Sequence, residues 1–384
     1  MDFSFDEETL ILLDSFSKFI KRELILKIEQ NNLNHNRDIP IDILEDVRKR
    51  SAELGFYGIH MPKEVGGGGL SNIGTCALRE EASKSGCILA PLALSGPEGT
   101  SPVFLFCNED QKKKYVYPLI NAEKTTCFAF TEPEAGSDPN GIKTTARKDG
   151  DFYILNGLKH YITNADRADY AVIMALTDPK LGLGGGLSAF IVEKETPGYR
   201  IGRIHDFMGS FVGVNQAEII LEDCKVPKEN MIGKEGNAFI SLMSFVAAGR
   251  LGIGASSVGI AHYLLEQCKE YANTRVQFGR PISRNQAIQW MLAEMATELY
   301  AARSMVYHCA WMVDQGKDAF KESSMVKLFA TEMVGRVADK AVQIFGGMGL
   351  SKELPIEAIY RNVRALRIVE GTSEIQKIII YRAL

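Results

Sequence analysis

The chain has 384 residues, 46% of them hydrophobic, and a formal net charge of −4. This length accommodates two or three domains, or one domain with a large core. The acidic balance argues against a protein that binds nucleic acid through a broad basic face, but it is compatible with one basic pocket for a phosphate-bearing ligand.

Cysteine usage and the first residues indicate the compartment. The seven cysteines are scattered and never form a C-x-x-C pair, so we expect buried free thiols in a reducing compartment. The six histidines show no spacing typical of ligands, so the sequence predicts no metal. Residues 1–8 are acidic, unlike a signal peptide, and no charge-free apolar run is long enough to span a bilayer. We therefore expect a cytoplasmic protein without a membrane segment.

The first third of the chain is predicted to be helical. Apolar residues recur every three or four positions from Leu10 to Leu24, and further helices are predicted at 41–54, 72–87 and 109–120. The glycine run at 66–69 lacks the strand before it and the helix after it that a phosphate-binding loop needs, so we interpret it as a plain loop.

The residue pattern changes between about 124 and 235, where short runs of β-branched and aromatic residues are separated by Gly, Asp, Asn or Pro. This pattern, without intervening helices, predicts an antiparallel sandwich or barrel. The predicted strands are 125–130, 152–163, 170–177, 188–194 and 216–226.

Long apolar helical patterns return at 237–275, 284–315 and 321–346, and short connections between them favour a four-helix bundle. The element order predicts an α+β fold with three parts. These are an N-terminal helical domain at 1–123, a central antiparallel β-domain at 124–235 and a C-terminal four-helix bundle at 236–384.

Four segments carry residues suited to chemistry, although each has an ordinary structural interpretation. Residues 131–138 (TEPEAGSD) form a polar turn after a strand, 159–164 (KHYITN) end a strand, and 275–279 (RVQFG) follow a helix. The fourth, 361–376 (RNVRALRIVEGTSEIQ), joins two short helices, with Thr372 or Ser373 as the cap of the second. The free N–H groups at the start of that helix are suited to an anion.

Taken together, these segments resemble the acyl-CoA dehydrogenase family over essentially the whole chain. The markers are TEPEAGSD (131–138), RVQFGRPI (275–282), VQIFGGMG (342–349) and EGTSEIQ (370–376), in the family's order. The resemblance implies a helical domain, a β-domain and a four-helix bundle, the order read from the periodicities alone.

The resemblance implies FAD-dependent oxidation of an acyl thioester to its trans-2-enoyl thioester. Glu370 matches the base that removes the α-proton, and its backbone N–H and a ribityl hydroxyl of the flavin match the oxyanion donors. A subset of the family places the base just before the residue that is Arg250 here. That position is Gly249, which cannot serve.

The resemblance also assigns binding residues. Within one subunit the flavin contacts would be Phe128, Thr131, Tyr161, Thr163 and Thr372. The neighbouring subunit would hold the adenine and pyrophosphate end through Arg275, Gln277, Phe278, Gln343, Gly346 and Gly347. Substrate contacts would be Ser137, Arg250 and Gly371. A shared cofactor implies an obligate homo-oligomer, a dimer of dimers, and the family's electron acceptor is electron-transfer flavoprotein.

This sequence departs from the family pattern on the thioester side. Most relatives have Trp at Tyr161, Tyr at Val369 and an acidic or amide residue at Ala247, and segment 208–215 is one residue longer. We therefore hypothesise an unusual substrate, either a branched or polar acyl group or one carried on an acyl-carrier protein. Glu98 and Thr100 are candidates for polar groups near the acyl end.

Several alternative functions remain open from sequence. A flavin-linked enoyl-CoA reductase uses the same site in the reverse direction, so the residues do not separate the two. Glu370 argues against a flavin monooxygenase or oxidase on this fold, because those usually lack the loop base. The net charge disfavours a nucleic-acid-binding relative. The intact Thr131, Thr163 and Arg275 argue against a flavin-free relative with a structural role.

Overall fold

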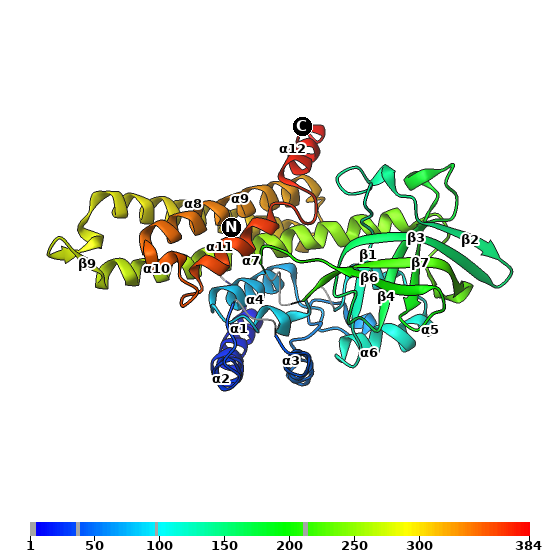
Figure 1. Cartoon of the computed structure of the whole chain (residues 1–384), viewed down its shortest axis with the longest axis horizontal. Coiled ribbons are helices and arrows are strands. Elements are labelled where there is room, and N and C mark those ends of the chain that lie inside the picture. The colour runs from blue at the N-terminus through cyan, green and yellow to red at the C-terminus, as the bar shows by residue number, and fades with distance from the viewer. Residues whose placement is uncertain (1–4, 36–38, 97–98, 210–213) are drawn as a thin grey trace.

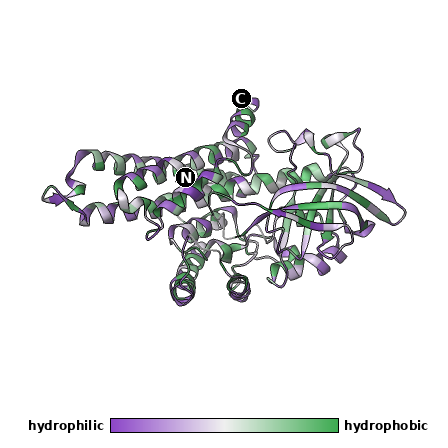
Figure 2. Cartoon of the chain, viewed as in Figure 1, coloured by the Kyte–Doolittle hydropathy of each residue, from purple (hydrophilic) through white to green (hydrophobic). Residues whose placement is uncertain are grey.

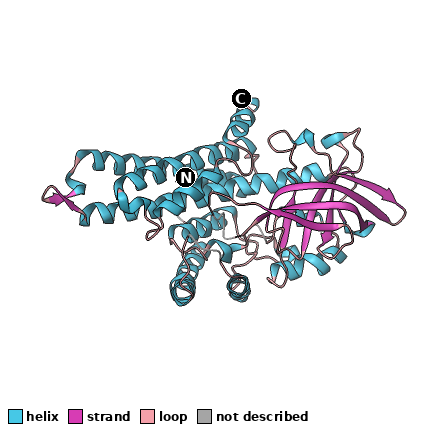
Figure 3. Cartoon of the chain, viewed as in Figure 1, coloured by secondary structure: helices cyan, strands magenta, loops and turns pink. Residues whose placement is uncertain are grey.

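The structure is a computed structural model that describes residues 5–35, 39–96, 99–209 and 214–384. Glu98 and residues 210–213 of the lengthened segment, both singled out in the sequence, lie outside the described residues. A β-sheet forms one end of the molecule, and a long helical bundle extends away from it (Figure 1). The N-terminal helices pack beside the junction of the two (Figure 3).

The N-terminal helices form where the periodicity predicts them. The first begins at Asp6, whose carboxylate accepts a hydrogen bond from the Thr9 N–H at 2.7 Å and so caps the helix. Two of the predicted helices contain one π-helical turn each, at Ile20–Leu24 and Lys112–Val116. The helices are α1 (Glu7–Phe19), α2 (Ile25–Gln30), α3 (Ile41–Glu53), α4 (Asn72–Lys84), α5 (Glu109–Gln111) and α6 (Tyr117–Ile120).

The middle of the chain folds into one eight-stranded sheet with the order β6-β7-β3-β2-β4-β5-β8 and β1 beside β4. The sheet is mixed, which corrects the antiparallel prediction: β1 and β2 both pair with β4 in parallel. The strands are β1 (Thr126–Ala129), β2 (Thr145–Asp149), β3 (Phe152–Thr163), β4 (Tyr170–Leu176), β5 (Leu187–Glu193), β6 (Tyr199–Ile204), β7 (Gln216–Pro227) and β8 (Met231–Ile232).

The sequence did not predict β2, β6 and β8, because these strands are short or largely polar. Strand β2 reads TARKD and its last three residues are exposed, so only its pairing with β3 identifies it. Figure 2 shows the same contrast, with hydrophobic residues along the central strands and hydrophilic residues towards the outer end of β2.

The C-terminal part is a helical bundle around a core shared by its four longer helices, α7, α8, α9 and α11. A small hairpin at its far end joins the first two of these helices (Figure 1). The elements are α7 (Ala238–Thr274), β9 (Val276–Gln277), β10 (Arg280–Pro281), α8 (Gln286–Asp314), α9 (Phe320–Phe345), α10 (Gly347–Leu350), α11 (Ile356–Leu366) and α12 (Ser373–Arg382).

Helix α7 is the one helix in the described part of the chain that is long and apolar enough to cross a membrane. Its buried residues, including Ala255, Val258 and Ala261, form part of the bundle core. It packs against α4, α8 and α9, and this packing accounts for its apolar composition.

Candidate active site

Glu370 lies in the turn between α11 and α12, and the backbone there is unusual. Glu370 has φ of 56° and the following Gly371 has φ of 91°, so two consecutive residues are left-handed. A non-glycine residue in this region is uncommon and persists where neighbouring groups hold it. Thr372 then caps α12 by accepting a hydrogen bond from the Ile375 N–H at 3.3 Å.

Two buried side chains hold the turn. The Lys327 ammonium donates to the Gly371 carbonyl at 2.8 Å, and Lys327 is fully buried. The Gln376 amide donates to the carbonyls of Glu370 at 3.1 Å and Gly371 at 2.9 Å. Both carbonyls of the strained turn are therefore hydrogen-bonded to residues of α9 and α12. These several contacts together hold the turn in its strained conformation.

The Glu370 side chain points towards α7 and packs on Gly249. A Cβ atom at Gly249 would lie 2.9 Å from the Glu370 carboxyl carbon and from one of its oxygens. Any side chain there would displace the carboxylate. The two positions at which the family resemblance places a base are thus adjacent in space, and the glycine at one makes room for the carboxylate at the other.

The carboxylate is poised to exchange a proton near neutral pH. Burial raises the pKa of Glu370 to about 7, although the positive charges of Arg250 and Lys327 partly oppose this shift. Burial also lowers the pKa of Lys327, to about 8. A general base works best when its pKa is near the working pH, so Glu370 has the properties that proton abstraction needs.

Arg250 lies on α7 next to Gly249 and is nearly fully buried. Its Nη1 donates to the Ser324 hydroxyl at 3.1 Å, and its guanidinium stacks 5.0 Å from the centre of the Phe320 ring. Arg250 and Lys327 place two cations near Glu370, which suits a site for a ligand that carries negative charge.

The residues predicted to hold the flavin ring come together on the sheet. Phe128 is on β1, and Tyr161 and Thr163 are on β3. The His160 N–H donates to the Thr131 carbonyl at 2.8 Å and so joins the loop after β1 to β3. The pairing of β3 with β7 is irregular here, Tyr161 has φ of 58°, and 51% of its side chain is exposed. The irregularity turns an aromatic face outwards.

The loop 131–138 is anchored by a buried ion pair that sequence analysis missed. The Lys159 ammonium, fully buried, lies 2.7 Å from a Glu132 carboxylate oxygen. The same carboxylate accepts from the N–H groups of Lys143 at 2.6 Å and Thr144 at 3.1 Å. These contacts fix the loop that presents Thr131, while Ser137 stays exposed.

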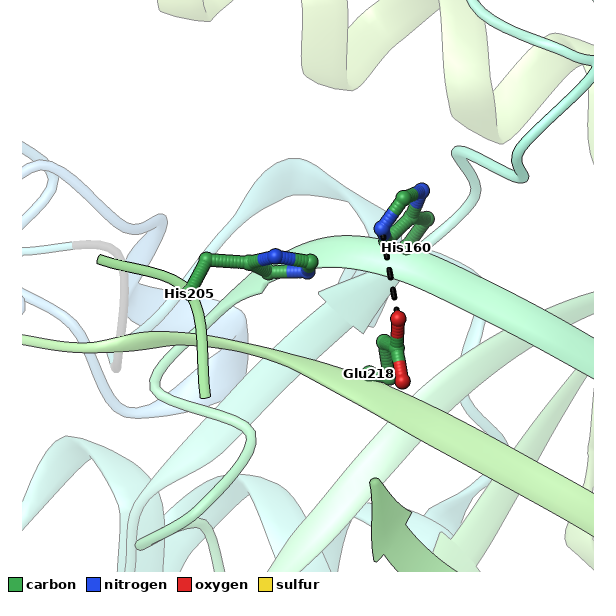
Figure 4. A group of neighbouring side chains, drawn as sticks. All are labelled: His160, His205 and Glu218. Carbon is green, nitrogen blue, oxygen red and sulfur yellow. Dashed lines mark ion pairs between the residues drawn. The ribbon is translucent and has the colours of Figure 1, made fainter. Parts of the chain in front are cut away.

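Figure 4 shows a second cluster, formed by His160, His205 and Glu218. The ring centres of His160 and His205 lie 4.0 Å and 4.5 Å from that of Tyr161. His160, His205 and Glu218 offer ligand atoms within 4.8 Å of one another, a proximity that sequence spacing could not show. However, Arg203 lies 3.3 Å from His205 Nδ1, and an arginine can only donate, so Nδ1 accepts and Nε2 keeps its proton. The lone pair of His205 is therefore engaged by Arg203, and a cation could bind there only if this contact were broken. The absence of a metal stays a prediction.

The predicted contacts of the adenine and pyrophosphate end lie far from the sheet, at the distal end of the bundle (Figure 1). Phe278 at the hairpin tip is 98% exposed, and a Cβ atom at Gly346 or Gly347 would meet no atom within 4 Å. The residues at this end are Arg275, Gln277, Phe278, Gln343, Gly346 and Gly347. The structure therefore does not bring them to Thr131, Tyr161 and Thr163 within one chain.

Comparison with known proteins covers nearly the whole chain. Family models for acyl-CoA dehydrogenase match in three parts: the N-terminal domain at residues 6–123, the middle domain at 127–224 and the C-terminal domain at 238–384. An acyl-CoA dehydrogenase of Bacillus subtilis (strain 168) is 42% identical over 337 residues, 88% of each chain. A 3-(aryl)acrylate reductase of Clostridium sporogenes is 42% identical over 338 residues, 88% of this chain and 89% of the relative.

Solved structures are also similar to this chain over nearly its whole length. The butyryl-CoA dehydrogenase of Megasphaera elsdenii has a TM-score of 0.89 and 33% identity, covering 100% of this chain and 99% of the other. A chain in a structure of the electron transferring flavoprotein of Acidaminococcus fermentans has a TM-score of 0.90 and 39% identity over the same shares.

The helical domain, the sheet and the bundle, with a partly buried carboxylate on a strained turn, define a three-domain oxidoreductase fold. The chain belongs to the acyl-CoA dehydrogenase family, whose members depend on FAD. The residues present suit this cofactor: Tyr161 offers an exposed aromatic face, and Thr131 and Thr163 offer hydroxyls beside it.

Proposed function

We propose that Glu370 is the base that removes the α-proton of an acyl thioester in the α,β-dehydrogenation typical of this family. The observation that carries the proposal is the Glu370 carboxylate itself, packed on Gly249 and held with a pKa of about 7 by burial. At neutral pH a large fraction of it is ionised and ready to accept a proton.

The turn also supplies a hydrogen-bond donor. Among the described residues, the Glu370 N–H has no acceptor, so it is available to the thioester carbonyl oxygen. As the α-proton moves to Glu370, negative charge develops on that oxygen, and a fixed N–H stabilises it. Lys327 and Gln376 keep the N–H and the carboxylate in one geometry, because both bind the carbonyls of the same turn.

Bound FAD supplies the acceptor for the hydride that leaves the β-carbon. On this chain, Tyr161 would lie against the flavin ring, and Thr131, Thr163 and Thr372 would donate hydroxyl hydrogen bonds to it. Arg250 would interact with the CoA moiety, together with Ser137 and Gly371. The exposed hairpin residue Phe278 and its neighbours would hold the adenine half of a cofactor bound to a second copy of the chain.

The reverse direction is the second candidate, because the same acid–base group serves both directions. A protonated Glu370 would return the proton to the α-carbon of an enoyl thioester. The similarity to a 3-(aryl)acrylate reductase supports this alternative. We further propose electron-transfer flavoprotein as the electron partner, a dimer of dimers as the assembly and the cytoplasm as the location.

The experiment is anaerobic bleaching of the bound flavin by a panel of acyl-CoAs, and by the same acyl groups on a carrier protein. We expect wild type to bleach and Glu370→Gln to retain flavin but not to bleach. Glu374→Gln, an exposed carboxylate on the same segment, is the matched control and should behave as wild type. Equal bleaching by Glu370→Gln would show that another group is the base. If an enoyl-CoA reoxidised the reduced flavin while no acyl-CoA bleached the oxidised flavin, the result would favour the reductase.

A further inference from the structure

Arg79 is a cation that the mechanism above does not use. It lies on α4 and extends onto α7, where a Cβ atom at Gly252 would be 3.4 Å from the Arg79 Nε and 3.6 Å from its Cζ. The guanidinium therefore lies against bare helix backbone. Arg79 is only partly exposed, and desolvation lowers its pKa below the usual range.

The guanidinium has no counter-ion in the described part of the chain, where no carboxylate pairs with Arg79 and no acceptor takes its hydrogen bonds. The nearby acids are engaged elsewhere. Glu80 accepts from Arg303 at 2.8 Å and from the Tyr307 hydroxyl at 2.6 Å, and Asp314 accepts from the Asn72 N–H at 2.7 Å. A partly desolvated cation without a partner is unfavourable unless a ligand supplies the anion.

The position of Arg79 relative to Glu370 follows from α7. Gly249 and Gly252 are three residues apart, so they share one face of the helix and are about 5–6 Å apart there. The Glu370 carboxylate packs on the first glycine and the Arg79 guanidinium on the second. The base and the unpaired cation thus lie along one face of α7, a short distance apart. Between them, Arg250 turns away to Ser324.

The surroundings of Arg79 are polar. The charge of Arg79 contributes to the low pKa of His60, which burial lowers to about 4, so His60 is neutral at pH 7. His60 Nε2 is 3.4 Å from the Thr100 hydroxyl, which is 3.0 Å from the Ser95 hydroxyl. Thr100, considered from sequence as a polar group near the acyl end, belongs to this neighbourhood.

We propose that Arg79 binds a carboxylate at the distal end of a short acyl group whose α-carbon faces Glu370, so that the substrate is a short dicarboxylic acyl thioester. The inference rests on the proposed function, because the role of Glu370 sets where the α-carbon lies. A guanidinium recognises a carboxylate through two parallel hydrogen bonds, and the interaction is strongest where water is excluded.

The test compares glutaryl-CoA with pentanoyl-CoA, which has the same chain length and a methyl in place of the carboxylate. We expect wild-type flavin to be reduced with the larger kcat/KM by glutaryl-CoA. Arg79→Met should lower kcat/KM for glutaryl-CoA by about 10- to 100-fold, the loss of a charged hydrogen-bonding partner, and leave pentanoyl-CoA unchanged. An unchanged reaction with pentanoyl-CoA also shows that the variant folds. Arg79→Lys should recover part of the kcat/KM lost with glutaryl-CoA.

Equal losses on both substrates, or a wild-type preference for pentanoyl-CoA or for 3-phenylpropionyl-CoA, would overturn the assignment of Arg79. Failure of the proposed function has a different signature, because neither substrate would then bleach wild-type flavin. Calorimetric binding to Glu370→Gln separates the two cases without turnover. Tighter binding of glutaryl-CoA than of pentanoyl-CoA, lost in Glu370→Gln combined with Arg79→Met, would support the carboxylate site, and equal binding would refute it.

Discussion

At the residue scale, the turn that carries Glu370 depends on a lysine that no marker segment contains. Lys327 is fully buried on α9, yet its ammonium reaches the Gly371 carbonyl at 2.8 Å and its charge lowers the pKa of Glu370. It therefore has two effects on the base, one geometric and one electrostatic. Lys327 does not touch the reacting atoms in our proposal, so it is a positioning residue.

Replacing Lys327 with Met should move the pH profile of flavin reduction. Glu370 acts as a base only when ionised, so kcat/KM rises with pH through its pKa of about 7. Loss of the positive charge raises that pKa, so we expect kcat/KM to rise over a pH range about one unit higher than in wild type. The decrease in kcat/KM relative to wild type should be largest below pH 7. It should become smaller above pH 8, where wild-type Lys327 loses its own charge.

Lys377→Met, which removes an exposed lysine on α12, is the control and should keep the wild-type profile. If Lys327→Met lowered the activity but left the pH dependence of kcat/KM unchanged, the lysine would act through geometry alone.

At the element scale, the loop between β1 and β2 is placed by charge buried within the sheet. Glu132 lies in the loop after β1 and Lys159 lies within β3, and their ion pair is almost completely buried. Burial lowers the pKa of Lys159 to about 8, while the lysine's charge and its hydrogen bonds keep the pKa of Glu132 below its usual range. The pair positions the loop that carries Thr131, which we propose as a contact of the flavin ring.

Removing one partner of this pair should cost more stability than removing both. Lys159→Met leaves a buried carboxylate without its cation, and we expect a loss of about 3–5 kcal/mol. The double variant Lys159→Met, Glu132→Gln should recover a large part of it. The urea midpoint of flavin release reports both effects. If the single and double variants released flavin at the same midpoint, the electrostatic account of this loop would be wrong.

At the scale of the whole molecule, the two predicted halves of the flavin site lie at opposite ends of the folded molecule (Figure 1). Phe278 is 98% exposed on a hairpin that projects from the bundle, and an exposed aromatic residue of this kind is typical of an interface. The fold of one chain thus suits the proposed sharing of the cofactor between copies.

Changing Phe278 to Asp should reduce flavin content and shift the protein towards smaller species, because a charge would have to be buried in the proposed interface. Sedimentation and the ratio of flavin to protein absorbance measure the two effects. Leu181→Asp, at a site 60% exposed on the loop after β4, is the control. A Phe278→Asp protein with full flavin content and unchanged sedimentation would contradict the shared site.

The sequence by itself determined the order of elements, the family and Glu370 as the candidate base. These depend on local information, because helical periodicity, strand alternation and short motifs extend over a few neighbouring residues. The same kind of signal predicted Thr372 or Ser373 as the cap of α12, and the structure shows that the cap is Thr372. The assigned roles of the site residues, the domain boundaries and the cytoplasmic location stay predictions.

Only the tertiary structure decided which groups surround the base. Lys327 and Gly371 are 44 positions apart, and the contacts of Gly249 with Glu370 and of Gly252 with Arg79 join segments that are distant in the sequence. The same is true of the mixed pairing around β4, because polar β2 is defined by its partners. Burial, and with it every shifted pKa in the site, exists only once these segments pack, so no local pattern could have shown it.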